Sequence, residues 1–424
     1  MITDVLIVGC GVSGLYCALN LPKDKNIIII TKSKAEESDS YLAQGGICVQ
    51  RDESDYDTFY EDTMKAGHYE NKPESVDIMI RSSRDVINDL VSFGVEFEKQ
   101  NGDFDYTREG AHSKERILYH EDETGKEITS KLLKEVKNRS NIRIIENFTM
   151  VDLIIENDEC GGVIGKNKDG RYESICSDYT VFATGGIGGL FAHSTNYSHL
   201  TGDALALSLK YNIKLKNIDY IQIHPTTLYT KKQGRAFLIS ESVRGEGAIL
   251  LNNKGERFVN ELLPRDVVAN AIFEEMKKED SEHVWLSLEP IPTQEIKSHF
   301  PNIYKKCLEE GYDITKEPIP VVPSQHYFMG GIDVDSNSKT SMERLYAVGE
   351  TACNGVHGRN RLASNSLLES LVFAKRAAQH ITSKYHDIES HKAPEIKESL
   401  YKNYETEYKE KVLTAIEKEK SNNE

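Results

Sequence analysis

Asp4-Val-Leu-Ile-Val-Gly9-Cys-Gly11-Val-Ser-Gly14, at the start of the chain, decides the fold. An apolar run that ends in G-x-G-x-x-G and continues into residues 15–19 predicts a buried strand, a tight turn and a helix start. Gly9 permits the turn, Gly11 lets backbone approach a phosphate, and Gly14 lets the helix pack on the strand. The helix N-terminus presents free N–H groups to an anion, so the motif predicts a dinucleotide-binding unit.

The second strand does not identify the dinucleotide. It covers residues 26–31 and is followed by Lys32 and Ser33. A nicotinamide enzyme usually carries Asp or Glu at this strand end to hold a ribose hydroxyl. Glu36 and Glu37 lie a few residues further on and could serve instead. These residues therefore leave the choice between NAD and FAD open.

The composition restricts the class of partner. The chain has 424 residues and a formal net charge of −16, so it is long enough for more than one core. A nucleic-acid or anionic-membrane surface needs clustered Lys and Arg, and we expect neither partner. No stretch approaches the roughly 20 apolar residues of a membrane span. We therefore expect a cytoplasmic protein, in which an anionic substrate would need a local cationic pocket.

The cysteines predict neither a disulfide framework nor a metal site. They lie at positions 10, 17, 48, 160, 176, 307 and 353, without a C-x-x-C pair or metal-ligand spacing. An odd number of scattered cysteines is typical of reduced thiols in a cytosolic protein. The N-terminal apolar run follows Asp4 without a basic lead, which favours a core strand over a signal peptide.

Periodicity predicts the remaining elements. We expect helices over 56–93, 127–138 and 364–384 and from Pro264, strands over 142–146, 149–156, 162–167, 179–183 and 344–348, and a hairpin around 248–255. Glycines after the third strand of the N-terminal unit, at Gly185 and Gly186, predict a return to the same crevice. The Lys/Glu-rich segment from 389 to the end predicts an exposed helix or partly disordered tail.

Eight motifs, in this order, resemble those of the L-aspartate oxidase family, within the succinate dehydrogenase/fumarate reductase flavoprotein superfamily. The resemblance covers about residues 3–384. The motifs are the Gly9 fingerprint, Ser40–Gly46, Thr107–Gly110, Gln222–Thr226, Glu241–Gly247, Pro264–Asp266, His326–Gly331 and Arg361–Glu369. The loop Ser40–Gly46 is similar to the flavin-contacting loop of that superfamily, so FAD is favoured over NAD.

The resemblance implies an α/β fold: a Rossmann-like FAD-binding domain with an inserted α+β capping domain and a short helical C-terminal tail. We expect the FAD-binding domain at 1–217 and 327–388, the capping domain at 218–326, and the remnant or tail at 389–424. Members with covalently bound flavin carry His five positions before the Gln of A-Q-G-G, where this chain has Asp39. The resemblance thus implies FAD held without a covalent bond. The implied FAD-binding residues are Gly9, Gly11, Val12, Ser13, Gly14, Lys32, Ser40, Ala43, Gln44, Gly45, Gly46, Asp203, Glu350, Ser366 and Leu367.

The family's activity implies roles for eight further residues. It oxidises L-aspartate to iminosuccinate and passes electrons to O2 or fumarate, as the first step of NAD biosynthesis through quinolinate, which suggests quinolinate synthase as a possible partner. The implied substrate-binding residues are Glu109, His224, Ser240, His326 and Arg361, and the implied proton-transfer residues are Arg265, Glu241 and Arg244. A guanidinium suits a carboxylate because its planar fork donates two parallel hydrogen bonds. Glu109 would favour the substrate's ammonium group and so distinguish aspartate from succinate.

Each of these residues also has a structural interpretation. The two histidines could be satisfied core residues, Arg361 a phosphate-binding or surface arginine, and Gly45–Gly46 a bare turn. Glu241 and Arg244 could form a structural ion pair, and Glu109 could be a loop acid paired with Arg108. Two other functions also stay open. A soluble fumarate reductase or succinate dehydrogenase subunit would share the arginines and histidines, and a flavin-binding protein without turnover would share the cofactor loop.

Overall fold

A parallel sheet organises the larger part of the protein. In the computed structural model, which describes residues 1–232, 234–386 and 393–423, its strands run in the order β7-β2-β1-β10, and β18 also pairs with β10. These strands span Ile142–Glu146, Ile27–Thr31, Ile2–Val8, Tyr172–Phe182 and Leu345–Ala347. Nearly every residue of β1 and β2 is buried, as in strands that are covered on both faces.

An antiparallel meander extends this sheet. The first half of β10 pairs with β9 (Glu159–Lys166), which pairs with β8 (Thr149–Glu156). The second half of β10 pairs with β18 in parallel. The strand is therefore longer than the expected 179–183, because one half serves the meander and the other half the parallel sheet.

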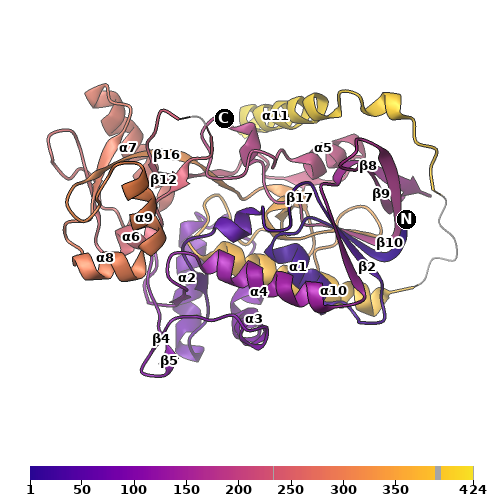
Figure 1. Ribbon diagram of the computed structural model, residues 1–424, viewed down its shortest axis with the longest axis horizontal. Coiled ribbons are helices and arrows are strands. Elements are labelled where there is room, and N and C mark those ends of the chain that lie inside the picture. The colour runs from indigo at the N-terminus through magenta and orange to yellow at the C-terminus, as the bar shows by residue number, and fades with distance from the viewer. Residues whose placement is uncertain (233, 387–392, 424) are drawn as a thin grey trace.

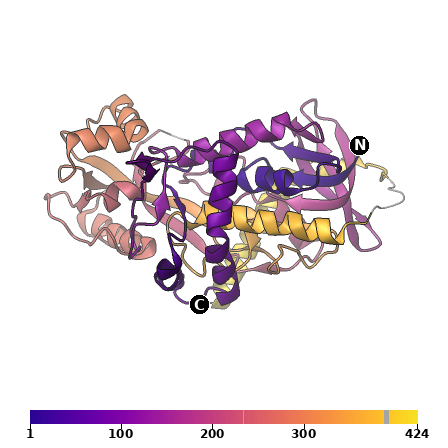
Figure 2. The same cartoon turned by 90° about the horizontal axis from the view of Figure 1, so that it is seen from below.

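Helices cover both faces of the sheet (Figure 1). On one face α1 (Val12–Asn20), α4 (Thr124–Asn138) and α10 (Asn365–Lys384) enclose a core that includes Val5, Ile7 and Ile29. On the other face α5 (Asp203–Lys210) and the meander enclose Leu6, Val8 and Ile30. Alternate residues of β1 thus point to different cores. Figure 2 shows α3 (Pro73–Ser92) crossing beside α10.

The helical stretch expected over 56–93 consists of two helices. The first, α2, spans Tyr56–Ala66, and α3 begins at Pro73. Gly67 caps α2, and His68 and Tyr69 follow with φ of 57° and 58°. Proline lacks the N–H that a helix interior needs, but it fits the first turn of a helix. This explains why α2 does not continue through Pro73 and why α3 begins there.

The segment 218–326, which we call the insert, builds a separate sheet in the order β13-β12-β16-β15-β14. Figure 1 shows it with its helices at the end of the molecule away from the N-terminus. The strands, in that order, span Phe237–Leu238, Ile221–Leu228, Ile319–Phe328, Val284–Ser287 and Ile249–Leu251, and the helices are α6 (Glu241–Gly245), α7 (Arg265–Glu279), α8 (Thr293–His299) and α9 (Pro301–Glu309). Strand β16 runs two residues past the expected boundary at 326. The expected boundary at 388 lies outside the described residues.

For residues 404–423 the helical alternative holds, although one stripe of the helix is buried. They form α11 (Tyr404–Asn423), which lies along α5. Tyr404, Tyr408, Val412 and Ile416 are buried in the core beneath the meander. The Tyr408 hydroxyl donates to the Val151 carbonyl oxygen at 2.6 Å. These four residues recur every fourth position, which gives the helix an apolar stripe.

The remaining strands are short. The strands are β3 (Ile47–Cys48) with β6 (Ile117–Leu118), β4 (Lys99–Gln100) with β5 (Asp103–Phe104), and β11 (Leu215–Lys216) with β17 (Gly331–Asp333) and β19 (Ala352–Cys353).

All seven cysteines are free and buried. Burial raises the pKa of Cys17 and Cys307 to about 12. Within the described residues no helix could cross a membrane and no group of side chains could hold a metal ion.

Candidate active site

One cavity lies where the carboxyl ends of β1, β2 and β10 meet the insert. Its volume is about 1660 Å³, part of which is open to solvent. Crevices of this kind, outside the carboxyl ends of parallel strands, are where α/β sheets bind ligands. The candidate residues that line it are Gly9, Gly11, Ser13, Lys32, Ser40, Ala43, Gln44, Gly45, Gly46, Glu109, Asp203, His224, Ser240, Glu241, Arg265, His326, Glu350, Arg361, Ser366 and Leu367. Val12, Gly14 and Arg244 lie behind this lining.

The turn after β1 requires glycine at two positions. Gly9 has a φ of 118°, and a Cβ there would lie 2.0 Å from the Ala183 carbonyl oxygen. A Cβ at Gly14 would lie 2.2 Å from the Gly9 carbonyl oxygen. The Ser40 hydroxyl accepts a hydrogen bond from the Val12 N–H at 3.2 Å. The turn, the start of α1 and the loop around Ser40 thus form one rigid edge of the cavity.

The end of β2 supplies one cation and one acid. Lys32 Nζ donates to Asp203 Oδ2 at 2.8 Å and to Thr201 Oγ1 at 3.1 Å, which ties β2 to the start of α5. Glu37 lines the cavity, and the hydrogen bond from the Ser33 hydroxyl lowers its pKa. Glu36 instead pairs with Lys137. Of the two acids that the sequence left open, Glu37 is the one beside the cavity.

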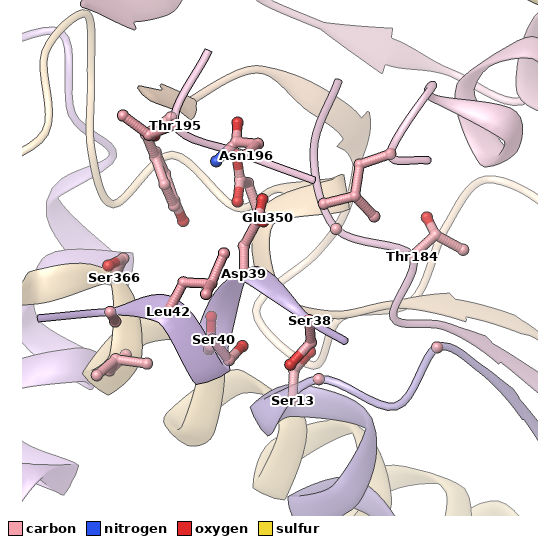
Figure 3. A pocket seen from close by; sticks show the side chains of 18 of the residues that line it. Ser13, Ser38, Asp39, Ser40, Leu42, Thr184, Thr195, Asn196, Glu350 and Ser366 are labelled. Atoms are coloured by element: carbon pink, nitrogen blue, oxygen red, sulfur yellow. The ribbon is translucent and has the colours of Figure 1, made fainter. Parts of the chain in front are cut away.

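The middle of the cavity holds buried oxygen atoms that lack protein partners. Figure 3 shows Asp39 and Glu350 side by side, with Ser13, Ser38 and Ser40 nearby. Burial raises the pKa of Asp39 to about 7, and burial together with Asp39 raises the pKa of Glu350 to about 8. Within the described residues, Asp39 Oδ2 and Gln44 Oε1 have no hydrogen-bond partner. Buried polar atoms are nearly always paired, so these atoms fit a hydroxyl-rich ligand such as the ribityl chain of a flavin.

The insert side of the cavity is cationic. Gln222 joins the two arginines there: its Oε1 accepts from Arg265 Nη1 at 2.8 Å, and its Nε2 donates to the Arg361 carbonyl oxygen at 2.8 Å. The His224 and His326 rings meet edge to face, with their centroids 5.1 Å apart. Arg361, His224, His326 and Arg265 therefore surround a shared space, which we call the cationic niche.

The two histidines of the niche are neutral. Burial, reinforced by Arg265, holds the pKa of both His224 and His326 well below the usual range. His224 Nδ1 lies 3.1 Å from both the Thr226 N–H, which can only donate, and the Thr226 carbonyl oxygen, which can only accept. His224 Nε2 is buried and has no partner in the described part of the chain. It is free to form a hydrogen bond with a ligand.

Arg361 approaches the niche from the start of α10. Its Nη1 donates to the Ser366 hydroxyl at 3.0 Å, and its guanidinium lies 4.4 Å from the Tyr327 ring centroid. Burial, then the neighbouring Arg265, lowers the pKa of Arg361 to about 10. Its Nε is buried without a partner among the described residues. A buried guanidinium with an unpaired N–H is suited to binding the carboxylate of a ligand.

Comparison with known proteins gives the family. Residues 4–367 match the family model described as an FAD binding domain. An L-aspartate oxidase of Clostridium perfringens is 54% identical over 92% of this chain and 88% of its own length, and one of Clostridium acetobutylicum is 53% identical over 89% and 88%. The chain belongs to the L-aspartate oxidase family. Like its relatives, this family member is an FAD-dependent oxidoreductase.

The fold comparison agrees with this family. An Escherichia coli quinol fumarate reductase matches with a TM-score of 0.85 and 28% identity, over 90% of this chain and 70% of that chain. The expected α/β architecture, with a Rossmann-like FAD-binding domain and an inserted capping domain, is therefore confirmed. FAD is confirmed as the cofactor.

In this L-aspartate oxidase family member, Arg265 begins a chain of buried charges. Its Nε donates to Glu241 Oε2 at 2.5 Å, and Arg244 Nη2 lies 3.4 Å from the same oxygen. Burial raises the pKa of Glu241, but Arg265 and Arg244 outweigh burial, so the pKa is lowered. Burial lowers the pKa of Arg244. Glu241 is thus an ionised bridge between two guanidinium groups.

Glu109 has no arginine partner in the described residues. The structure does not pair it with Arg108. Instead its Oε1 accepts from the Ser242 hydroxyl at 2.7 Å, and its Oε2 accepts from the Ser364 hydroxyl. Burial, then Glu241, raises the pKa of Glu109. The carboxylate lies against Gly45, where a Cβ would come within 2.6 Å of Glu109 Oε1, so Gly45 is more than a bare turn.

Several residues of the site were missed by sequence reasoning. Thr195 holds His326, with its Oγ1 at 2.7 Å from Nδ1. The sequence predicts Asp39 only as the replacement for a histidine and predicts no role for Ser242. The predicted residue Ser240 lines the cavity and accepts from the Ser242 N–H at 3.2 Å. Ser242 follows Glu241, and Gln222 opens the motif that contains His224. These positions inside predicted motifs are the sequence signal for both residues.

Proposed function

We propose that this protein oxidises L-aspartate to iminosuccinate and passes the electrons to O2 or fumarate. The observation that carries the proposal is that Glu109 lines the same cavity as the cationic niche. A dicarboxylate needs the niche, and an ammonium group needs an anion beside it. The names of the 54% and 53% identical relatives support the same substrate.

We assign the substrate's carboxylates to the cationic niche. Arg361 offers a guanidinium, His224 offers an unpaired ring nitrogen, Nε2, and His326 is held in place by Thr195. Ser240 offers a hydroxyl from the N-terminus of α6. We assign the ammonium group to Glu109. Both ends of the substrate are thereby fixed, and positioning of this kind lowers the barrier of the chemical step.

Oxidation removes one hydride and one proton from L-aspartate and leaves a C=N bond. Bound FAD supplies the acceptor for the hydride. We assign the proton to the chain Arg265, Glu241 and Arg244. A guanidinium loses its proton only above about pH 12 in water, so Arg265 needs the ionised Glu241, at 2.5 Å, to take part in proton transfer.

We propose that the FAD is held without a covalent bond. Asp39 stands where covalent-flavin members carry histidine, and a carboxyl group with a pKa of about 7 suits hydrogen bonding to the flavin instead. We assign FAD to residues 1–217 and 327–388, a capping role to 218–326, and a remnant role to the C-terminal helix. We also propose that the reaction is the first step of NAD biosynthesis through quinolinate, with quinolinate synthase as a possible partner.

A soluble fumarate reductase or succinate dehydrogenase is the second candidate. The likeness to a quinol fumarate reductase, with a TM-score of 0.85, favours it. Glu109 opposes it, because an unpaired carboxylate beside a bound dicarboxylate repels it.

Anaerobic reduction of the bound flavin decides between the two. The holoprotein is mixed with L-aspartate, D-aspartate or succinate while the visible absorbance of oxidised flavin is followed. We expect bleaching by L-aspartate and much slower bleaching by the other two. Bleaching by succinate alone would establish the second candidate. A flavin that none of the three reduces would identify a binding protein without turnover.

A further inference from the structure

The Glu109 carboxylate is held by two neutral donors that come from different parts of the chain. Ser242 lies in α6 of the insert, and Ser364 is the residue before α10. Each hydroxyl donates to a different carboxylate oxygen. Glu109 itself is 3% exposed. Its carboxylate cannot rotate to exchange its partners without breaking both bonds.

Ser364 also connects Glu109 to the flavin-facing loop. Its hydroxyl accepts from the Gly46 N–H at 3.2 Å while donating to Glu109. It adopts a φ of 60°, and its carbonyl oxygen accepts from the Cys48 N–H at 3.1 Å. The Ser364 backbone and hydroxyl are therefore fixed by the strand and loop that precede the site. Arg361 is three residues before Ser364. The same short segment therefore carries the proposed carboxylate ligand and a donor to Glu109, the proposed ammonium ligand.

The choice of hydroxyl groups has an electrostatic consequence. An arginine bound to Glu109 would cancel its charge, whereas a hydroxyl fixes the carboxylate and leaves the charge in place. A buried charge without a counter-ion is costly, and that cost is relieved by a ligand that brings a cation. A plain dicarboxylate brings none.

We propose that Ser242 and Ser364 are positioning residues that select an amino dicarboxylate over a plain dicarboxylate, by fixing the Glu109 carboxylate without neutralising it. This inference rests on the proposed function. The clamp, meaning Ser242, Ser364 and Glu109, closes only when α6 of the insert lies against the FAD-binding part. Substrate selection is thereby tied to the packed arrangement of the two parts.

Ser242→Ala removes one donor to Glu109 and leaves the Ser242 N–H bond to Ser240 in place. It also removes the acceptor of the Ser240 hydroxyl, at 3.1 Å, so it is read together with Ser242→Thr. We expect kcat/KM for L-aspartate to fall about tenfold, as for loss of a hydrogen bond to a charged group. We expect fumarate reduction to change less than about twofold, because fumarate has no ammonium group. Ser242→Thr keeps the hydroxyl and should restore L-aspartate oxidation. Ser364→Ala should act in the same direction, with FAD retention measured alongside because of the Gly46 bond.

Ser208→Ala is the matched control: Ser208 is fully buried, and among the described residues its hydroxyl donates only to the Ala204 carbonyl oxygen within α5. A double-mutant cycle then separates positioning from general structure. In a Glu109→Gln background, Ser242→Ala should cause no further loss of L-aspartate oxidation. Equal losses for L-aspartate and fumarate, or losses that add to those of Glu109→Gln, would overturn the clamp alone. A wild-type flavin that L-aspartate does not reduce would overturn the proposed function and the clamp with it.

Discussion

Glu109 is the residue whose replacement separates two activities of one cavity. Glu109→Gln removes the negative charge and keeps both hydroxyl partners within reach. We expect kcat/KM for L-aspartate to fall about 100-fold, close to 2.7 kcal/mol, while fumarate reduction falls much less. Steady-state rates for the two substrates on the same preparation measure the difference. Glu115→Gln, on an exposed stretch nearby, is the control. Similar losses with both substrates would remove Glu109 from substrate selection.

Arg265 is the residue on which proton transfer depends. Arg265→Leu removes the donor to Glu241 and Gln222 but touches none of the glycines that cradle the dinucleotide. We expect FAD to stay bound and turnover to fall below detection, a loss of several kcal/mol in transition-state stabilisation. Flavin absorbance after gel filtration and L-aspartate-dependent reduction measure both. Arg171→Leu, at an exposed turn, is the control. Measurable turnover would exclude Arg265 from the reaction.

The sequence predicted which side chains meet but not how they are held. G-x-G-x-x-G and the family motifs placed both arginines and both histidines on one cavity, because each motif fixes local backbone. The partners of Glu109 could not be predicted in this way. Ser242 and Ser364 are 122 positions apart in the numbering and meet only after the insert folds against the larger sheet. Contacts of that kind depend on tertiary packing, which periodicity and motif spacing do not predict.

At the scale of the elements, α11 tests how a stripe of apolar side chains stabilises a polar helix. Ile416 is 6% exposed, whereas Leu413, on the same helix, is 37% exposed. We expect Ile416→Ala to lower the free energy of unfolding by about 2 kcal/mol and Leu413→Ala to change it by no more than about 0.5 kcal/mol. Denaturant titration of both variants measures this. Equal effects would mean that α11 does not dock in solution.

A helix was among the expectations for residues 404–423, but its docking was not. The central strands and α10 were predicted well, because continuous apolar runs and Gly-rich ends are local signals. The charges of residues 404–423 masked the stripe at every fourth position. The surface that it covers, on α5 and β8, is far away in the sequence. The 56–93 stretch is helical as expected, but Gly67 and Pro73 are local signals of a break inside it that the helical spacing alone does not show.

Helix α10 carries a buried acid that makes stability depend on pH. Burial, opposed by hydrogen bonds from Asn354 and Ser370, raises the pKa of Glu369 to about 7. Between the unfolded pKa of about 4.3 and pH 7 the native state keeps a proton that the unfolded state has lost. This contribution to stability is therefore complete below about pH 4.3 and disappears as pH rises through 7, at up to about 1.4 kcal/mol per pH unit.

Glu369→Gln removes this titration and should flatten the dependence. With FAD in excess, the free energy of unfolding measured from pH 5 to 8 should fall less steeply in the variant than in the wild type. Glu417→Gln is the control, because Glu417 is an exposed acid on a helix, α11, that lies far along the chain from Glu369. Parallel curves for wild type and Glu369→Gln would show that Glu369 is ionised throughout.

At the scale of the whole molecule, Asp122 fastens the insert to the larger part. It precedes α4, yet it caps α9 of the insert: its Oδ2 accepts from the Ile303 N–H at 2.7 Å, and its Oδ1 accepts from the Asn302 side chain at 2.7 Å. Free N–H groups in the first turn of a helix favour such an acceptor. Asp122 is 3% exposed, so the contact is internal.

Asp122→Ala should therefore loosen the insert without changing the site's chemistry. We expect a loss of about 1–2 kcal/mol of stability, faster amide hydrogen exchange over 293–309, and a higher KM for L-aspartate. Asp313→Ala is the control, because the Asp313 carboxylate binds only within its own turn, to Thr315 and Lys316. Exchange over 293–309 that stays at the wild-type rate would show that other contacts suffice to hold the insert.

The burial of the thiols affects how easily the protein is oxidised during turnover. When dioxygen takes the electrons, its two-electron reduction yields hydrogen peroxide beside the flavin. Peroxide attacks thiolates, and thiolates are scarce when a thiol is buried and its pKa is high. All seven cysteines are buried, and burial raises the pKa of Cys10, next to the dinucleotide turn, to about 12. Peroxide formed in this way would thus meet no thiol that is easily oxidised.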